Sequence, residues 1–99
     1  MGGNRMPRQE TYKTKFVDRM PPDDMLEDGV LYVAPHFQVA IHKCMCGCGE
    51  KVVTPLEDNG WAWSYDGSIK AVTLAPSVGN FQQPCKSHYF LTHGRVHWV

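Results

Sequence analysis

The stretch HKCMCGCGEK, residues 42–51, is the most informative part of this sequence, because it holds three of the four cysteines within five positions. Cys44, Cys46 and Cys48 stand at every second position, and glycine follows each of the last two. The fourth cysteine, Cys85, lies far downstream in QPCKSHYF. A single role for all four thiols therefore requires a fold that brings these two stretches together.

Size and charge limit the classes of protein to which the chain can belong. Ninety-nine residues make one domain with a small core, which gains from a metal or disulfide staple. Ten Lys plus Arg balance ten Asp plus Glu, so the basic surface of a nucleic-acid binder is missing. The N-terminal MGGNRMPRQETYK is too polar for a signal peptide, and no later stretch approaches the ~20 apolar residues of a membrane span. We expect a cytoplasmic protein with no membrane or nucleic-acid partner.

That compartment bears on the cysteines. In a reducing cytosol, closely spaced cysteines are more often metal ligands or catalytic groups than disulfides. A disulfide between Cys44 and Cys46, or between Cys46 and Cys48, would also close a very small and strained ring. Thiolates suit zinc, which takes four ligands in structural sites, so the cluster predicts a zinc site.

Short strands dominate the predicted secondary structure. Alternating or continuous apolar runs, such as 12–16 and 30–34, are separated by turn residues such as Asp66-Gly67, and no ten-residue segment has helical periodicity. We predict a mainly β fold, a single small antiparallel β domain of about seven short strands stapled by a zinc site. It spans residues 12–99 behind a flexible N-terminus at 1–11.

The aromatic stripe Trp61, Trp63 and Tyr65 alternates along one predicted strand. A chain this small needs its aromatic side chains for burial, so we assign the stripe to the core. The remaining histidines are expected to be surface or satisfied core residues; they are His36, His42, His93 and His97.

Five residues compete for the four positions of a tetrahedral site. The four cysteines can hold the metal alone, or His88 can replace one of the three clustered thiols through the spacing Cys-Lys-Ser-His. In the first arrangement the His88 imidazole is free for chemistry. Ser77, in the loop APSVGN, would then be a candidate nucleophile with His88 as its base and the backbone of Val78 and Gly79 as an oxyanion site. Serines in such loops more often cap turns.

The order of motifs carries a family resemblance. GVLYVAP, CMCGCGEKVVTPL, VTLAPSVGNF, PCKSHYF and GRVHWV resemble the bacterial domain-of-unknown-function 6527 family from about Tyr12 to the C-terminus. Members of that family are small zinc-binding proteins, and some are encoded beside ubiquitin-like conjugation genes with E1-like and E2-like enzymes.

The resemblance implies a function and a set of site residues. Zinc would be held by Cys44, Cys46, Cys48 and Cys85, and a serine-type peptidase or isopeptidase would use Ser77 and His88 to process or remove a ubiquitin-like protein. The partners implied are that protein or its conjugates, and E1-like or E2-like proteins. The third member of a triad stays unranked among Asp58, Asp66, Asn80 and the other polar residues. The alternative is a non-catalytic zinc-binding interaction module of the same pathway.

Overall fold

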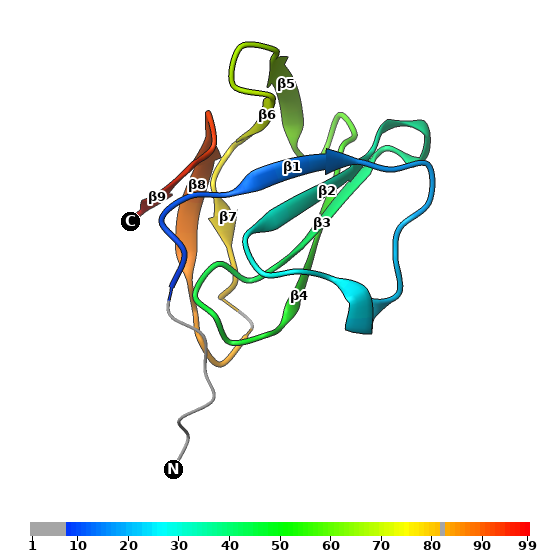
Figure 1. Ribbon diagram of the computed structural model, residues 1–99. Helices are drawn as coiled ribbons and strands as arrows, with labels where there is room; N and C mark the ends of the chain where they lie inside the picture. Colours follow the sequence, from blue (N-terminus) through cyan, green and yellow to red (C-terminus); the bar gives the residue numbers. More distant parts are fainter. Residues whose placement is uncertain (1–7, 82) are drawn as a thin grey trace.

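The computed structural model describes residues 8–81 and 83–99, which form nine short strands and two 3₁₀ turns (Figure 1). The elements are β1 (Lys13–Phe16), η1 (Asp23–Met25), β2 (Val30–Ala34), η2 (Pro35–Phe37), β3 (Val39–Lys43), β4 (Lys51–Pro55), β5 (Ala62–Asp66), β6 (Ala71–Ala75), β7 (Val78–Gly79), β8 (His88–Thr92) and β9 (Arg95–Trp98). The predicted mainly β class is confirmed, with somewhat more strands than the predicted seven. No helix of the described residues has the length and apolar character needed to cross a membrane.

The first sheet has the order β1-β2-β3-β4. The β2–β3 and β3–β4 pairs are antiparallel, but β1 lies parallel to β2, with Lys13 opposite Val30 and Phe16 opposite Val33. The predicted antiparallel domain therefore contains one parallel pair, at this edge. Residues 17–29, which include η1, form a connection long enough to carry the chain back to the start of β2, as a parallel pair requires.

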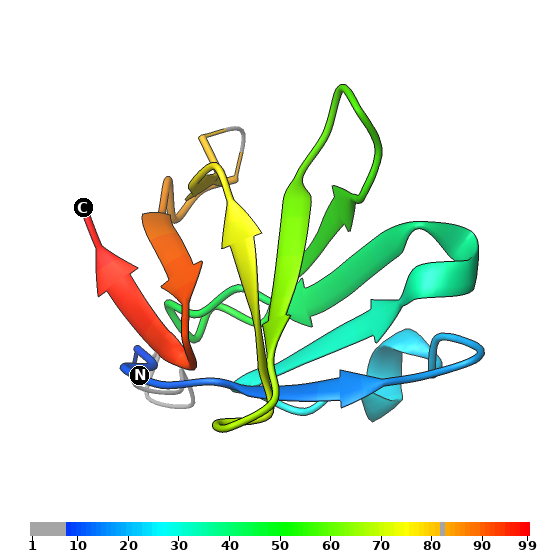
Figure 2. The same cartoon turned by 90° about the horizontal axis from the view of Figure 1, so that it is seen from above.

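Two smaller antiparallel sheets complete the domain. One is the β5–β6 hairpin, and the other has the order β7-β8-β9. Figure 2 shows β6 next to β8, which places the β5–β6 hairpin between the C-terminal sheet and the four-stranded sheet. The loop from β6 to β7 is short, so the two sheets share the segment that carries Ser77.

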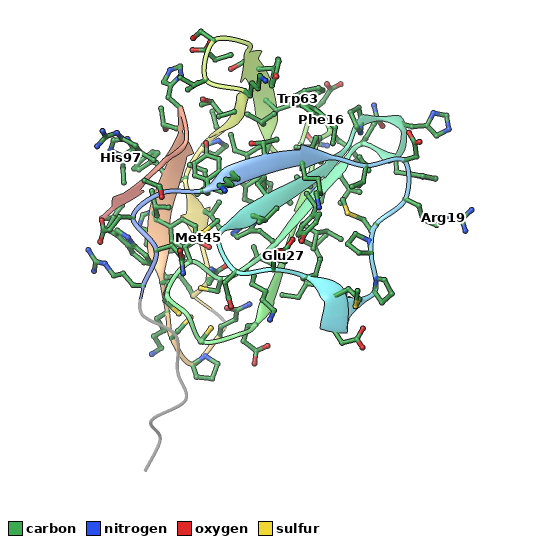
Figure 3. All side chains as sticks on the ribbon, viewed as in Figure 1. Phe16, Arg19, Glu27, Met45, Trp63 and His97 are labelled. Atoms are coloured by element: carbon green, nitrogen blue, oxygen red, sulfur yellow. The ribbon has the colours of Figure 1, made fainter. Side chains whose placement is uncertain are left out.

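The core lies where the three sheets meet. Its fully buried side chains come from all three; the largest are Tyr89, Leu31, Met45, Leu74, Leu91, His42, Val33, Val72 and Val78. Burying such apolar side chains is the main favourable term in folding. Met45 lies inside the cysteine cluster, and Figure 3 shows it near the middle of the fold. The core thus reaches directly to the cluster.

The aromatic stripe of β5 does not behave as predicted. Trp61 packs against the core, but Trp63 is 39% exposed and Tyr65 is 49% exposed. Their rings instead contact Phe16 of β1, at centroid distances of 6.1 Å and 5.2 Å, and Figure 3 shows Phe16 and Trp63 together. The physical reason is that β5 belongs to a sheet of only two strands, and apart from Asp66 all of its residues are exposed.

Part of the segment predicted to be flexible is hydrogen-bonded to the domain. Of residues 1–11, residues 1–7 lie outside the described residues. Gln9 N–H donates to Met45 O (2.7 Å), Trp98 Nε1–H donates to Gln9 O (2.9 Å), and Val96 N–H donates to Glu10 O (2.9 Å). Residues 8–11 therefore lie between the cysteine loop and β9.

Candidate metal and active site

The cysteine loop is a tight connection between two paired strands. Cys44 follows β3 directly, and its N–H donates to Glu50 O (2.8 Å) just before β4 begins. The chain reverses within these few residues because Gly47 and Gly49 adopt φ values of +90° and +88°. Residues with a Cβ rarely adopt such φ values, so the two glycines let the loop turn while it directs its thiols to one side.

All four thiols meet at one point. The sulfur atoms of Cys44, Cys46, Cys48 and Cys85 lie within 4.8 Å of one another. Cys44 Sγ is 3.4 Å from Cys46 Sγ and 3.8 Å from Cys85 Sγ. Four sulfurs around a tetrahedral zinc at about 2.3 Å would be about 3.8 Å apart. The donor set and its spacing therefore fit a metal site, and His88 is not part of this group.

The surroundings of the cluster show which groups a metal would displace or use. Burial raises the pKa of Cys48 to about 12 and also raises the pKa of Cys44, so without a cation these thiols keep their protons. A metal that takes thiolates replaces those protons. The Asn80 side-chain amide donates to Cys44 Sγ (3.4 Å), the kind of outer contact that orients a ligand sulfur.

Ser77 and His88 form a hydrogen-bonded pair on the β7–β8 ladder. Ser77 immediately precedes β7, and His88 is the first residue of β8. The register pairs Gly79 with His88, so Ser77, two residues before Gly79, places its side chain on the same face. The Ser77 Oγ lies 2.7 Å from His88 Nε2. This is the geometry that a serine nucleophile and its general base require.

Two aromatic side chains flank the His88 imidazole. The Phe81 ring lies edge-on at a centroid distance of 5.3 Å, and the Phe90 ring is stacked at 6.3 Å. Both phenylalanines are themselves exposed, at 61% and 43%. On the serine side, Trp61 Nε1–H donates to Ser77 O (3.3 Å) and holds the backbone of Ser77. The pair is therefore fixed in position but accessible from solvent.

Among the described residues, none of the three named candidates for the third member of a triad has a hydrogen bond to the His88 side chain. Asp66 accepts hydrogen bonds from the backbone and side chain of Ser68, which lowers its pKa, and it lies 3.7 Å from His93. Asn80 donates to Cys44 Sγ and to Tyr89, and Asp58 is an exposed loop residue. Within residues 8–81 and 83–99, no hydrogen bond from a side chain reaches His88 Nδ1.

The register of β7 directs the two expected oxyanion donors, the N–H groups of Val78 and Gly79, in opposite directions. Asn80 N–H donates to Ser87 O (2.7 Å), so Val78, two residues earlier, also directs its backbone toward β8 and pairs with Tyr89. The N–H of Gly79 points the other way. Val78 is therefore excluded as a donor, and of the two proposed donors only the Gly79 N–H is directed away from the ladder.

A buried network joins the cysteine cluster to the β7–β8 ladder. The Tyr89 hydroxyl lies 2.8 Å from His42 Nε2 and receives hydrogen bonds from Met45 N–H (3.3 Å) and the Asn80 amide (3.4 Å). His42 was expected to be a surface or a satisfied core residue, but it is fully buried and its Nδ1 has no partner among the described residues. The alternation of β3, which places Ala40 and His42 on the buried face, was the available signal.

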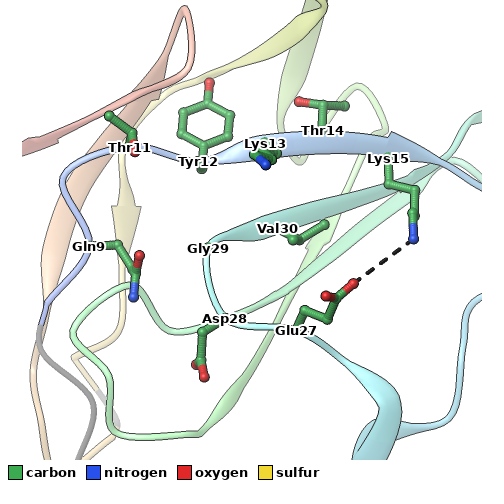
Figure 4. Close-up of a pocket in the computed structure, with 10 residues that line it drawn as sticks. All are labelled: Gln9, Thr11, Tyr12, Lys13, Thr14, Lys15, Glu27, Asp28, Gly29 and Val30. Carbon is green, nitrogen blue, oxygen red and sulfur yellow. Dashed lines mark ion pairs between the residues drawn. The ribbon is translucent and has the colours of Figure 1, made fainter.

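A separate hollow of about 490 Å³ lies between β1 and residues 27–30 (Figure 4). Lys15 Nζ and Glu27 Oε2 form an exposed ion pair across it at 4.0 Å. None of its lining residues is a cysteine, Ser77 or His88. It is therefore distinct from the metal and serine sites.

A small β domain with a four-thiol site and an accessible serine–histidine pair is compatible with a metal-stapled serine hydrolase. The chain belongs to the family described as bacterial ubiquitination-like system serine protease (BubE), whose model matches residues 16–99. This match supports the predicted link to a bacterial ubiquitin-like system, although not the domain-of-unknown-function 6527 designation itself. No curated protein and no solved structure matches the chain.

Proposed function

We propose that Ser77 and His88 are the catalytic nucleophile and general base of this serine protease, and that its substrate is a ubiquitin-like protein or one of its conjugates. The observation that carries the proposal is the 2.7 Å contact between Ser77 Oγ and His88 Nε2 on an accessible face. The family match supports a serine protease in a ubiquitination-like system. The proposal covers both peptide and isopeptide linkages, because both present the same acyl carbon to Ser77.

The chemistry follows from the pair. His88 Nε2 takes the proton of Ser77 as Oγ attacks the carbonyl carbon, and then gives it to the departing amine. Ser77 is left as an acyl ester. Water then attacks the ester with His88 again as base, which releases the carboxylate and restores the Ser77 hydroxyl. Each step leaves His88 in the protonation state that the next step needs.

The four cysteines are proposed to hold a structural zinc ion. Zinc bound by Cys44, Cys46, Cys48 and Cys85 would supply folding free energy and leave no open position for a water. Cys85 lies three residues before His88, so a metal there would fix the start of β8. We further propose that the protein acts in the cytoplasm and meets E1-like or E2-like proteins through shared conjugates.

The proposal is tested with Ser77→Ala. A reporter fused to the C-terminus of a ubiquitin-like protein is the peptide substrate, and the same protein attached to a lysine side chain is the isopeptide substrate. Ser77→Ala is expected to lower cleavage of both at least about a thousandfold, and to leave zinc content and melting temperature unchanged. The matched control is Ser64→Ala on exposed β5, which should keep full activity.

A fluorophosphonate probe adds an independent readout, because it labels activated serines covalently. Labelling that maps to Ser77 and disappears in His88→Gln would support the pair. Undiminished cleavage by Ser77→Ala would exclude Ser77 as the nucleophile. Cleavage of the fusion but not of the lysine conjugate would restrict the enzyme to peptide bonds.

A further inference from the structure

Two open strand edges line one groove beside the Ser77–His88 pair. β4 is the last strand of the four-stranded sheet, and β7 is the first strand of the C-terminal sheet. Residues of both strands line a groove of about 350 Å³, and Figure 1 shows that these strands come from different sheets. The groove is thus bounded by backbone on two sides.

The register of β4 turns the backbone of Val53 into the groove. Cys44 N–H donates to Glu50 O, and Leu56 N–H donates to Gln38 O, at the two ends of the β3–β4 ladder. In an antiparallel ladder such bonded pairs alternate with pairs whose N–H and C=O point outward. Val53, opposite Ile41, falls on an outward position. Its N–H and C=O are therefore directed to the open edge of β4.

The register of β7 does the same for Gly79. The Asn80–Ser87 pair is a bonded pair, so Gly79 and His88 form the outward type of pair. A Cβ at position 79 would collide with the ring of Phe81, which lies over this glycine. Glycine therefore lets Phe81 stay beside His88 while the edge of β7 stays open. Each side of the groove offers one N–H and one C=O.

Contacts near the two ends of these strand segments fix the direction of the groove. At one end the Gln83 side-chain amide donates to Lys51 O (3.5 Å). At the other end Trp61 donates through its backbone N–H to Pro55 O (2.8 Å) and through Nε1 to Ser77 O. The nucleophile thus lies at the Trp61 end. β4 runs toward that end, and β7 runs away from it.

We infer that this groove binds the substrate on the N-terminal side of the scissile bond as one extended strand between β4 and β7, antiparallel to β7 and parallel to β4. The inference rests on the proposed function. The scissile carbonyl lies at Ser77, and Gly79 is two residues further along β7. In an antiparallel pair, two residues along one strand correspond to two residues back along the other, so the third residue before the cut pairs with Gly79. The carbonyl before that residue accepts from Val53 N–H.

The walls of the groove indicate which side chains it accepts. Phe81 is exposed beside His88, and Val53 is 48% exposed on β4. No acidic residue lines the groove in the part of the chain that the structure describes. The bound segment should therefore be extended and carry small or apolar side chains.

The test uses acetyl-Ala p-nitrophenyl ester and acetyl-Ala-Ala-Ala p-nitrophenyl ester with the zinc-loaded chain. The longer ester places a residue opposite Gly79, and its acetyl carbonyl reaches Val53 N–H. Val53→Pro removes that N–H without touching the ladder to β3, and proline is tolerated at an outward position of an edge strand. Val53→Thr is the matched control because it changes the side chain and keeps the N–H.

The wild type and Val53→Thr should both prefer the longer ester in kcat/KM by about tenfold, and Val53→Pro should lose most of this preference. N-methylation of the residue opposite Gly79 should abolish it in the wild type as well. Equal rates for the two esters, or a preference that survives in Val53→Pro, would overturn the inference. Ser77-dependent hydrolysis of the short ester would in that case leave the proposed function intact.

If instead Ser77→Ala hydrolyses the short ester as fast as the wild type, the proposed function fails. A binding experiment then tests whether the groove accepts an extended strand. Acetyl-Ala-Ala-Ala amide is then titrated while the backbone amides are followed by nuclear magnetic resonance. Shifts concentrated at Val53 and Gly79 would support the groove as a strand-binding site. Unchanged amides at both positions, at millimolar peptide, would reject it.

Discussion

Two histidines of this protein each contact a hydroxyl at nearly the same distance, yet they lie in opposite surroundings. His42 Nε2 is 2.8 Å from the Tyr89 hydroxyl, and His88 Nε2 is 2.7 Å from Ser77 Oγ. His42 and Tyr89 are fully buried, and burial lowers the pKa of His42 to about 4 and raises the pKa of Tyr89. The Ser77–His88 pair is half-buried, and Phe81, whose ring contacts His88, lines a groove.

The difference shows that a short imidazole–hydroxyl contact does not by itself define a catalytic pair. No substrate can reach the Tyr89 hydroxyl, and a buried His42 that stays neutral serves packing and hydrogen bonding. Ser77 combines the same contact with access and with two open strand edges. The comparison predicts that one pair controls stability and the other controls activity.

The largest expected effect comes from removing the proposed metal, because both pairs depend on segments that the cysteines join. Met45, which donates to Tyr89, lies inside the cysteine loop, and Cys85 leads into His88. Chelation is expected to lower the free energy of unfolding by more than about 5 kcal/mol, since structural zinc sites bind with about 10 kcal/mol or more. Circular dichroism during thermal melts, with and without added zinc, measures this. A chelated chain that melts at the same temperature would contradict a structural metal.

Replacing each histidine with glutamine separates the two pairs. His88→Gln removes the proposed base and should lower kcat/KM by a factor of about 100 to 10,000 with little change in melting temperature. His42→Gln should lower the free energy of unfolding by about 1 to 3 kcal/mol and leave the activity of the folded fraction near that of the wild type. Cleavage kinetics and thermal melts of both variants measure these two effects. Equal loss of activity in the two would break the distinction between them.

Removing the buried hydroxyl tests the stability side alone. Tyr89→Phe leaves His42, Met45 N–H and the Asn80 amide without their shared oxygen, which should cost about 2 kcal/mol. Tyr65→Phe, on exposed β5, is the matched control and should change stability by less than about 0.5 kcal/mol. Urea denaturation measures both. Similar values for the two variants would show that the buried network contributes nothing of its own.

The smallest expected effect is a pH dependence. The pKa of His42 is about 4 in the folded protein against an ordinary value of 6.5, so the unfolded chain binds the extra proton first as pH falls. Stability is therefore lost below pH 6.5. Between pH 6.5 and 5.5 the wild type should lose about 1 kcal/mol more than His42→Gln. If the free energy of unfolding falls equally with pH in the two proteins, a group other than His42 causes the loss.

Local patterns in the sequence were sufficient to predict much of the secondary structure. Turn dipeptides and alternating runs predict most strands, because period-two patterning and positive-φ residues are local properties. The parallel β1–β2 pair and the exposed Trp63 and Tyr65 were missed for the same reason. Which strand neighbours which, and which face the other sheets cover, depends on contacts between distant segments.

By itself the sequence determined the chemistry available: four thiols suited to one metal, and a serine and a histidine on either side of the fourth cysteine. Only the tertiary structure decided which groups meet. It places the four sulfurs within 4.8 Å, excludes His88 from that group and sets its Nε2 against Ser77, while a second histidine, His42, is enclosed with Tyr89. The physical reason is that residue type fixes what a side chain can do, whereas strand register and burial fix what it touches.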